Sequence, residues 1–323
     1  MKEEILNIEN LKIYYKSVWG DYKVVDDVSL KIYKGEIFGV AGESGCGKST
    51  LVEGVLRLVK PPGYVAGGKV VFEGKNLLEL SHEELRRIRW RRLAYIPQGA
   101  MNSLNPVLGI EEQMIDAILD HASYLSREKA REFAFSALEA VGLPPDEVLK
   151  MFPHELSGGM RQRVIIATAI ALSPSLVVAD EPITALDVVM VRAVLDTLAM
   201  LKEKYGITVI FVSHDMAAHA ELVDRLAIMY AGKIMEVGDV EGIFYDPLHP
   251  YTQGLVNAIP RLGKKLMKPI PGLAPSPLNW PPGCRFHPRC PQANERCRRE
   301  VPELVEVEPG RFVACHVVSG DVS

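Results

Sequence analysis

One glycine-rich segment constrains the fold more than any other feature: GESGCGKST, residues 42–50, follows an apolar strand expected at Ile37–Ala41. A helix is expected directly after it, at about residues 48–58. In this context the glycines let backbone N–H groups turn inward on phosphate groups, and the helix N-terminus adds a favourable dipole. The segment therefore predicts a nucleotide-phosphate site, formed by Gly42, Ser44, Gly45, Cys46, Gly47, Lys48, Ser49 and Thr50.

Two residues of this loop have specific chemistry. Lys48 can reach the β and γ phosphates, and the Ser49 hydroxyl can bind Mg²⁺. Cys46 lies at a variable position, where we expect only a small side chain.

The hydrophobic pattern predicts an α/β fold. Alternating residues in ILNIENLKIYY, and again from Val24, indicate an antiparallel β subdomain. Helical spacing with Ser126 as N-cap and Gly142 as C-cap indicates a helical subdomain inserted at about residues 99–172. Further segments complete a mainly parallel core: strands at 68–73, 92–96, 175–179, 208–212 and 226–230, and a helix at 188–205.

A second motif supplies carboxylates. SLVVADE, residues 175–181, is an apolar strand ending in Asp180 and Glu181. Asp180 would hold Mg²⁺, and Glu181 is placed to orient and deprotonate an attacking water. Many strands end in Asp-Glu, but this one follows a phosphate-binding loop, and the pair favours a nucleotide-hydrolysing site.

A third motif distinguishes the chain from other phosphate-loop enzymes. In HELSGGMRQR, residues 154–163, Ser157, Gly158 and Gly159 begin a helix, so free N–H groups and a hydroxyl form a second anion site. The segment resembles the signature motif of the ABC ATPase family. The resemblance to that family covers residues 1 to about 240. The resemblance implies that Gln162 also contacts a partner's ATP.

Other motifs of that family occur in order. Tyr15 resembles its adenine-stacking aromatic residue, with Tyr14 as the alternative. Gln98 in YIPQ resembles the Q-loop residue that contacts Mg²⁺ and water. Asp187 in ITALD resembles the D-loop, and His214 in VSHD resembles the switch histidine at the γ-phosphate.

The resemblance implies a split site. Two such domains pair head to tail, and each ATP lies between one phosphate loop and the partner's signature helix. A lone subunit is then expected to hydrolyse slowly. The implied partners are a second, related ATPase subunit, two membrane permease subunits and an external solute-binding protein.

The proline-rich C-terminal region, residues 241–323, points to a subfamily. It resembles the C-terminal region of oligopeptide/dipeptide importer ATPases, in which some members have a [4Fe–4S] cluster. Four of the five cysteines lie here: Cys284, Cys290, Cys297 and Cys315. Four thiolates match the ligand count of a cluster, whereas no two cysteines have the zinc-ribbon separation of two residues.

Zinc, free thiols and disulfides stay open as alternatives for the cysteines, with His287 and His316 as alternative ligands. A cluster would stabilise the tail and take no part in ATP chemistry, since every nucleotide motif lies before residue 216.

Composition limits the other functions. Hydrophobic residues make up 48% of the 323 residues, and the net charge of -4 gives no reason to expect a nucleic-acid surface. The basic run at residues 86–92 is expected as a solvated helix face. We expect no signal peptide, and no stretch of about 18–20 apolar residues occurs in the sequence. We expect a peripheral subunit on the cytoplasmic side of the cell (inner) membrane.

The rival function is a soluble ABC ATPase in DNA repair or translation. Chromosome-maintenance types insert a long coiled coil between the two glycine motifs, and no sustained heptads occur here. Translation-factor types have two cassettes, and this chain has one. Cargo stays open among peptides, oligosaccharides and nickel.

Overall fold

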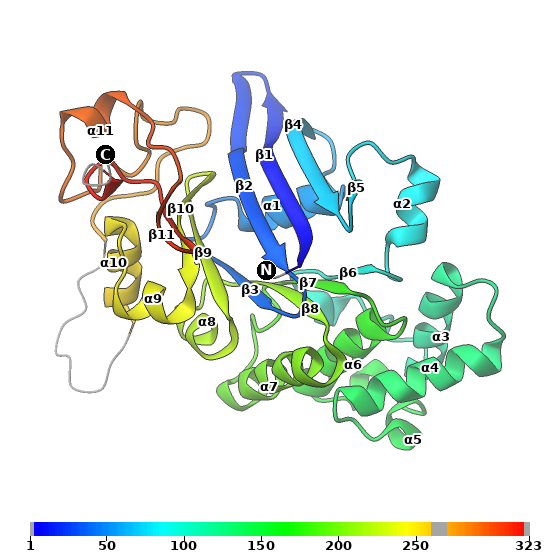
Figure 1. Cartoon of the computed structure of the whole chain (residues 1–323). Helices are drawn as coiled ribbons and strands as arrows, with labels where there is room; N and C mark the ends of the chain where they lie inside the picture. Colours follow the sequence, from blue (N-terminus) through cyan, green and yellow to red (C-terminus); the bar gives the residue numbers. More distant parts are fainter. Residues whose placement is uncertain (1–2, 260–269, 320–323) are drawn as a thin grey trace. The chain divides into compact units, whose positions relative to one another are not determined.

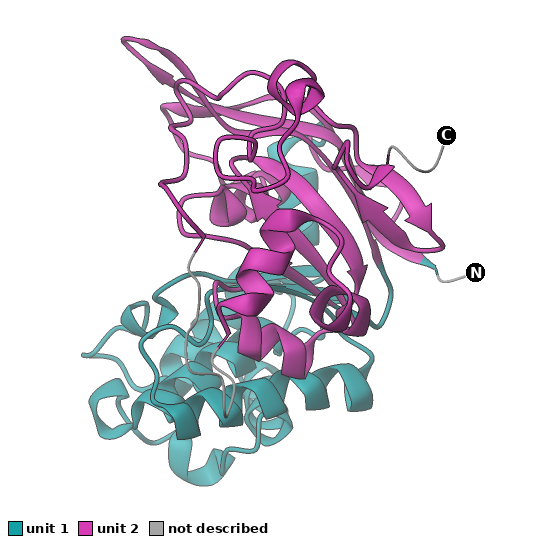
Figure 2. Cartoon of the chain, turned by 90° about the vertical axis from the view of Figure 1, so that its left-hand side faces the viewer, with its two compact units in different colours: residues 1–3, 33–37, 79–212 teal, residues 4–32, 38–78, 213–323 magenta. Residues whose placement is uncertain are grey.

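The computed structural model describes residues 3–259 and 270–319, and the chain divides into two compact units. Unit 1 comprises residues 1–3, 33–37 and 79–212, and unit 2 comprises residues 4–32, 38–78 and 213–323 (Figure 2). Parts of the predicted tail, residues 260–269 and 320–323, lie outside the described residues.

Unit 2 contains the predicted antiparallel sheet. Its strand order is β2-β1-β4-β5, and Figure 1 shows β2, β1 and β4 side by side. In β1, buried residues alternate with exposed ones, as a sheet with one covered face requires. The bounds are β1 Glu4–Ser17, β2 Gly20–Tyr33, β4 Gly63–Phe72 and β5 Lys75–Asn76.

The remaining strands of unit 2 follow the order β11-β12-β10-β9-β3. β3 and β9 are parallel, with Gly39 opposite Leu226, and the others pair antiparallel. The tail thus extends the sheet through Val313, which pairs with Glu236. The bounds are β3 Ile37–Ala41, β9 Arg225–Tyr230, β10 Lys233–Asp239, β11 Val305–Glu308 and β12 Arg311–Val313.

The helices of unit 2 are short. α1 follows the glycine-rich loop directly, and α9 to α11 belong to the C-terminal region. The bounds are α1 Lys48–Val55, α8 Met216–Leu222, α9 Val240–Tyr245, α10 Pro250–Asn257 and α11 Glu295–Arg299.

Unit 1 places three parallel strands beside a group of helices. β6 Leu93–Ile96, β7 Leu176–Asp180 and β8 Thr208–Val212 are neighbours, and every residue of β7 and β8 is buried. Such continuous apolar strands are typical of parallel sheets covered on both faces. The helices are α2 His82–Ile88, α3 Ile110–His121, α4 Arg127–Ala140, α5 Pro145–Val148, α6 Gly158–Ile170 and α7 Val188–Tyr205.

These elements confirm the predicted α/β class with an antiparallel sheet and a helical region. The helix bounds follow local capping: Ser126 accepts a hydrogen bond from the backbone N–H of Lys129, and Gly142 adopts φ 69° just beyond α4. α1 ends at Val55, three residues before the predicted end, because Arg57 takes a left-handed φ of 53°.

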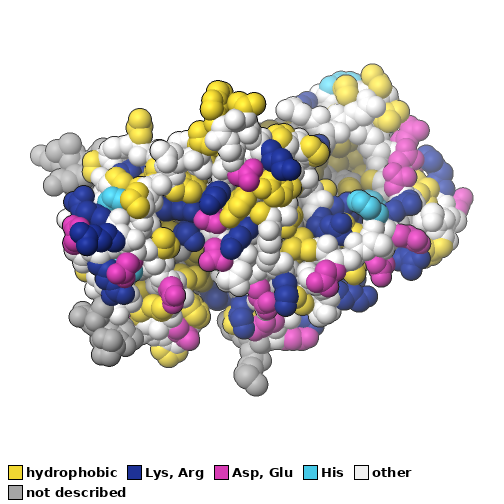
Figure 3. Space-filling model, turned by 90° about the horizontal axis from the view of Figure 1, so that it is seen from above, with side chains coloured by type: hydrophobic (Ala, Val, Ile, Leu, Met, Phe, Trp, Pro, Cys, Tyr) yellow, Lys and Arg dark blue, Asp and Glu magenta, His cyan; other side chains and the backbone are white. Residues whose placement is uncertain are grey.

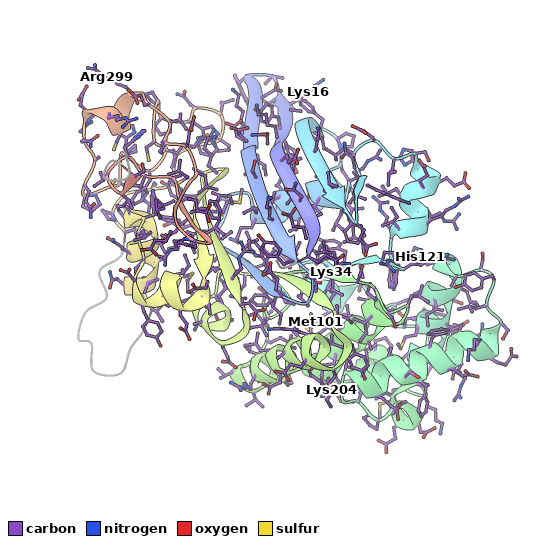
Figure 4. All side chains as sticks on the ribbon, in the orientation of Figure 1. Lys16, Lys34, Met101, His121, Lys204 and Arg299 are labelled. Carbon is purple, nitrogen blue, oxygen red and sulfur yellow. The ribbon has the colours of Figure 1, made fainter. Side chains whose placement is uncertain are left out.

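The expected solvated helix face at residues 86–92 holds for Arg86 and Arg87, which are exposed on α2, but not for the residues that follow α2. α2 ends at Ile88, and the residues beyond it fold back on unit 1. Arg91 Nε donates to the carbonyl of His121 at 2.7 Å, and Trp90 Nε1 donates to the carbonyl of Thr168 at 2.9 Å. Figure 4 labels His121 at the end of α3, where a cation is favoured by the helix dipole.

The surface charge is mixed. On the face shown in Figure 3, acidic and basic side chains are interspersed rather than gathered into fields of one sign. Within the described ranges, none of the helices combines the length and apolar character that crossing a membrane requires.

Candidate functional site

The glycine-rich loop of unit 2 has the backbone that its sequence requires. Gly42 adopts φ 153°, and a Cβ there would lie 2.1 Å from the carbonyl oxygen of Met229. At Gly47, with φ 109°, a Cβ would lie 2.6 Å from the carbonyl oxygen of Val24. Only glycine fits both positions, so the loop is held close against two neighbouring strands.

Lys48 is poised inside this loop. Its Nζ donates to the carbonyl oxygens of Gly42 at 2.8 Å and Glu43 at 3.3 Å, and the residue is 6% exposed. Ser44 and Gly45 are exposed, and Ser49 and Thr50 are half-buried in the first turn of α1. The ammonium group therefore lies in a loop whose rim is open to an incoming phosphate.

Cys46 is a buried packing residue, as expected. Burial raises the pKa of its thiol, which therefore stays protonated at neutral pH. Its carbonyl accepts a hydrogen bond from the backbone N–H of Gly232 at 2.9 Å.

Tyr14 and Tyr15 lie on opposite faces of β1. The Tyr14 hydroxyl donates to Asp26 Oδ1 at 2.8 Å, and burial together with this hydrogen bond raises the pKa of Tyr14. Tyr15 lies opposite Gly63, where a Cβ would approach its ring to 2.7 Å, and it is half-buried. Tyr14 is half-buried as well, so the two tyrosines differ in their partners and not in their exposure.

His214 lies in unit 2 between the end of β8 and the start of α8, and its side chain is exposed. Its neighbours fix the turn. Asp215 accepts hydrogen bonds from the first backbone N–H groups of α8, and Ser213 Oγ accepts from the Asp215 N–H at 3.1 Å.

Asp180 and Glu181 lie at the carboxyl end of β7 in unit 1. Asp180 is 1% exposed, and the Tyr95 hydroxyl is 3.5 Å from its Oδ2. Glu181 adopts a left-handed φ of 49°, and its Oε2 accepts from Thr184 Oγ1 at 3.0 Å. A strained backbone at a buried carboxylate is common at functional sites. Gln98, two residues beyond β6, is exposed.

The predicted second anion site begins α6. Ser157 is the N-cap, and its Oγ accepts from the Met160 N–H at 3.3 Å. Ser157 is exposed and Gly158 half-buried, whereas Gln162 is buried within the unit. The exposed start of α6 is thus the part that a second chain can reach.

Met190, a residue that the sequence did not single out, connects the start of α6 to Asp187. Asp187 is the N-cap of α7 and accepts from the Met190 N–H at 2.9 Å. The Met190 Sδ accepts from the Gly159 N–H at 3.0 Å. Figure 4 labels Met101, whose sulfur would be 3.9 Å from a Cβ at Gly158. A methionine at i+3 from a capping aspartate is an unspecific pattern.

The four tail cysteines lie in unit 2, where Cys284, Cys297 and Cys315 are buried and Cys290 is half-buried. Burial, followed by the neighbouring Cys297, Cys315 and Cys290, raises the pKa of Cys284 to about 11. Among residues 3–259 and 270–319, however, no three His, Cys, Asp or Glu side chains are grouped so as to hold a metal ion. His287 and His316 bind backbone carbonyls, of Cys284 and Glu300.

The tail also contacts the glycine-rich loop. Arg289 Nη1 and Nη2 donate to Glu43 Oε2 and Oε1 at 2.7 and 2.9 Å. The tail is therefore not separate from the phosphate-binding loop, although every nucleotide motif precedes residue 216. No spacing rule could have found a contact between residues 246 positions apart.

Two family models match the chain. Residues 25–184 match the model described as ABC transporter, and residues 235–297 match the model described as oligopeptide/dipeptide transporter, C-terminal region. The chain is 42% identical over 315 residues to the dipeptide transport ATP-binding protein DppD of Caldanaerobacter subterraneus, with 97% of each chain covered. It is 40% identical over 316 residues to the oligopeptide transport ATP-binding protein OppD of Escherichia coli, covering 97% of this chain and 93% of that one.

Solved structures resemble the fold. A dimeric post-hydrolysis state of the ATP-binding cassette MJ0796 bound to ADP and Pi has a TM-score of 0.64 and 28% identity. The match covers 73% of this chain and 98% of that one. A second dimeric structure of MJ0796, described as a bacterial ABC transporter cassette, has a TM-score of 0.64 and 29% identity.

Proposed function

From the premise that the chain belongs to the ABC transporter ATPases, as an ATP-binding subunit of the oligopeptide/dipeptide importer family, we propose how its residues perform that function. The subunit hydrolyses ATP to power peptide uptake through membrane permease subunits. The observation that supports this most directly is the loop of residues 42–50, whose left-handed glycines surround a buried, preplaced Lys48.

The candidate residues have distinct roles. In unit 2, Lys48 and the loop N–H groups would bind the phosphates, Tyr15 would stack on adenine, and His214 would contact the γ-phosphate. In unit 1, Glu181 would take the proton from the attacking water.

Magnesium would be held by Ser49, Gln98 and Asp180. Its charge would offset the negative charge of the phosphates during transfer. These oxygen donors suit a hard cation. Residues 1–240 would thus form the nucleotide-binding domain, and residues 241–323 the importer-type tail.

The second proposal concerns a split site. Ser157, Gly158, Gly159 and Gln162 would serve the ATP bound by a second, related ATPase subunit, and Asp187 would lie at the shared interface. Beside Asp187, Val188 is 85% exposed and Val189 is 80% exposed. Adjacent exposed valines support a surface that another subunit covers.

The remaining partners follow from importer function. Two permease subunits would hold the ATPase on the cytoplasmic side of the cell membrane, and an external solute-binding protein would deliver the peptide. The rival function in DNA repair or translation has no support among the relatives described above, which are transport proteins. Nickel and oligosaccharides have none either.

The third proposal is that the four cysteines bind a [4Fe–4S] cluster. Four cysteines in the C-terminal region of unit 2, three of them buried, support it, since thiolates suit iron–sulfur clusters and zinc. The described side chains do not form a ready-made metal site, so no catalytic role is assigned to the cluster.

The test of ATPase function separates binding from turnover. In the assembled importer, Glu181→Gln is expected to retain ATP binding while turnover falls on the order of 10²–10⁴-fold, because the base is lost. Lys48→Ala is expected to weaken ATP binding itself. Glu203→Gln and Lys204→Ala, both exposed on α7, are matched controls. Unaltered turnover in Glu181→Gln would remove Glu181 from this role.

A further inference from the structure

We propose that Arg289, in the cysteine-rich tail, is a positioning residue that holds the phosphate-binding loop in its ATP-binding conformation through Glu43. The inference rests on the proposed ATP site at Lys48. It adds a residue outside every nucleotide motif to the determinants of ATP affinity.

The contact between Arg289 and Glu43 is bidentate, and all three guanidinium nitrogens of Arg289 donate hydrogen bonds. Besides the two bonds to the Glu43 carboxylate, Arg289 Nε donates to the Pro271 carbonyl at 2.8 Å. Its Nη1 also donates to the Tyr230 hydroxyl at 3.3 Å, and Nη2 to the Ile270 carbonyl at 3.4 Å. The planar fork of an arginine fits a carboxylate in this way, and a lysine cannot reproduce it.

Burial makes the pair strong. The Arg289 side chain is 6% exposed and that of Glu43 is 28% exposed, so water screens them little. The hydrogen bonds to Glu43 raise the pKa of Arg289 above its ordinary value.

Glu43 is held at its backbone as well as at its side chain. Its N–H donates to the Tyr251 hydroxyl at 2.9 Å, and its carbonyl accepts from Cys46 N–H at 3.2 Å and from Lys48 Nζ at 3.3 Å. Moving Glu43 would therefore move an acceptor of the phosphate-binding lysine.

The support beneath Glu43 comes mainly from the C-terminal half of unit 2. The rings of Tyr230, Tyr251 and Phe286 pack with centroids 4.6 to 5.3 Å apart. His249 caps α10 by accepting the Tyr251 N–H at 3.0 Å, and burial lowers the pKa of His249 to about 3, which keeps that nitrogen unprotonated. Tyr251 is thereby fixed in place.

Arg285 offers a matched control. It lies four residues before Arg289, its side chain is also 6% exposed, and it pairs with Asp26 of β2 instead of with the loop. If substitution merely destabilised the cysteine-rich segment, changing either arginine would weaken ATP binding. An effect through Glu43 would follow only from changing Arg289.

The experiment measures ATP dissociation constants for the full-length chain, KM and kcat for the assembled importer, and the melting temperature without nucleotide. Arg289→Lys and Glu43→Gln are each expected to raise the dissociation constant and KM for ATP on the order of 10- to 100-fold. We expect kcat at saturating ATP to stay close to wild type, since bound nucleotide reorders the loop. The double variant should raise the dissociation constant for ATP no more than either single change does, because both single changes remove the same contact.

Lys48→Ala separates this inference from the proposed function. If Lys48→Ala weakens ATP binding while Arg289→Lys binds like wild type, the positioning role is wrong and the ATP site stands. The positioning role is equally wrong if Arg285→Lys raises KM as much as Arg289→Lys does. If Lys48→Ala leaves ATP binding unchanged, the ATP site itself is wrong.

Discussion

Two adjacent tyrosines differ in what their positions in β1 allow. The hydroxyl of Tyr14 is bound to Asp26, and its ring lies edge-on to Tyr64 with centroids 6.2 Å apart. The ring of Tyr15 faces the other way, over Gly63. Because strand residues alternate between faces, only one of the two can stack on the same base.

Replacing each ring separately tests this assignment. Tyr15→Leu is expected to weaken ATP binding by about 1–3 kcal/mol, the usual contribution of base–aromatic stacking. Tyr14→Leu is expected to leave ATP affinity unchanged and to lower the melting temperature, because Asp26 loses a partner. Titration with ATP and thermal unfolding of both variants measure the two effects. The opposite pattern would assign adenine to Tyr14.

Sequence spacing predicted the candidate residues of the phosphate site but not the residues that support them. Lys48, Asp180 and Glu181 belong to short motifs whose chemistry depends on neighbours in the chain. Arg289 and Tyr251 reach Glu43 only through the tertiary fold, and a single sequence has no signal for such contacts. Gln162 was predicted to contact a partner's ATP but is buried within the unit. Its burial depends on how α6 packs, which the sequence motif does not reveal.

Among the elements, some were predicted to the residue, whereas β7, predicted at 175–179, is Leu176–Asp180. β8 Thr208–Val212 and α7 Val188–Tyr205 have the predicted bounds, because a wholly buried run and the Asp187 cap define them. The tail was predicted to be loop-rich. The pairing of β12 with β10 was missed, because three residues, Arg311–Val313, are too short for a period-2 signal.

Iron content tests the tail proposal. Protein purified without oxygen is expected to contain about four iron and four sulfide per chain and to be brown. Cys290→Ser should lose the iron. ATP affinity is expected to fall with it, because Arg289 directly precedes Cys290 and depends on the same segment. Colourless protein with one zinc per chain would show that the cysteines bind zinc instead of a cluster. Metal-free protein with four reactive thiols would show that the cysteines bind no metal.

At the scale of the whole molecule, the proposed pairing of ATPase subunits would account for the exposed start of α6. A serine at an N-cap stabilises any helix by about 1 kcal/mol. Ser157 is expected to do more, because its hydroxyl would also face the partner's γ-phosphate. Ser126 caps α4 in the same unit and by the same hydrogen bond, so it separates the two contributions.

Alanine substitutions at the two caps make the comparison. Ser157→Ala and Ser126→Ala are expected to destabilise the isolated chain similarly and to leave its ATP binding intact. Only Ser157→Ala should lower ATP hydrolysis by the assembled importer, roughly ten- to a hundredfold for a hydrogen bond to a charged group. Equal ATPase rates for the two variants, or an isolated chain as fast as the complex, would contradict the split site.

The Arg289–Glu43 pair also has a consequence for biosynthesis. The loop leaves the ribosome early, whereas its supporting arginine is translated 246 residues later. At typical rates of about 5–20 residues per second, the interval is of the order of tens of seconds. During that time the nascent chain contains the phosphate-binding loop without the Arg289 side chain that binds Glu43. With Arg289 positioning the loop as proposed, full affinity for ATP is expected only of the finished polypeptide, and an incomplete chain is expected to bind nucleotide more weakly.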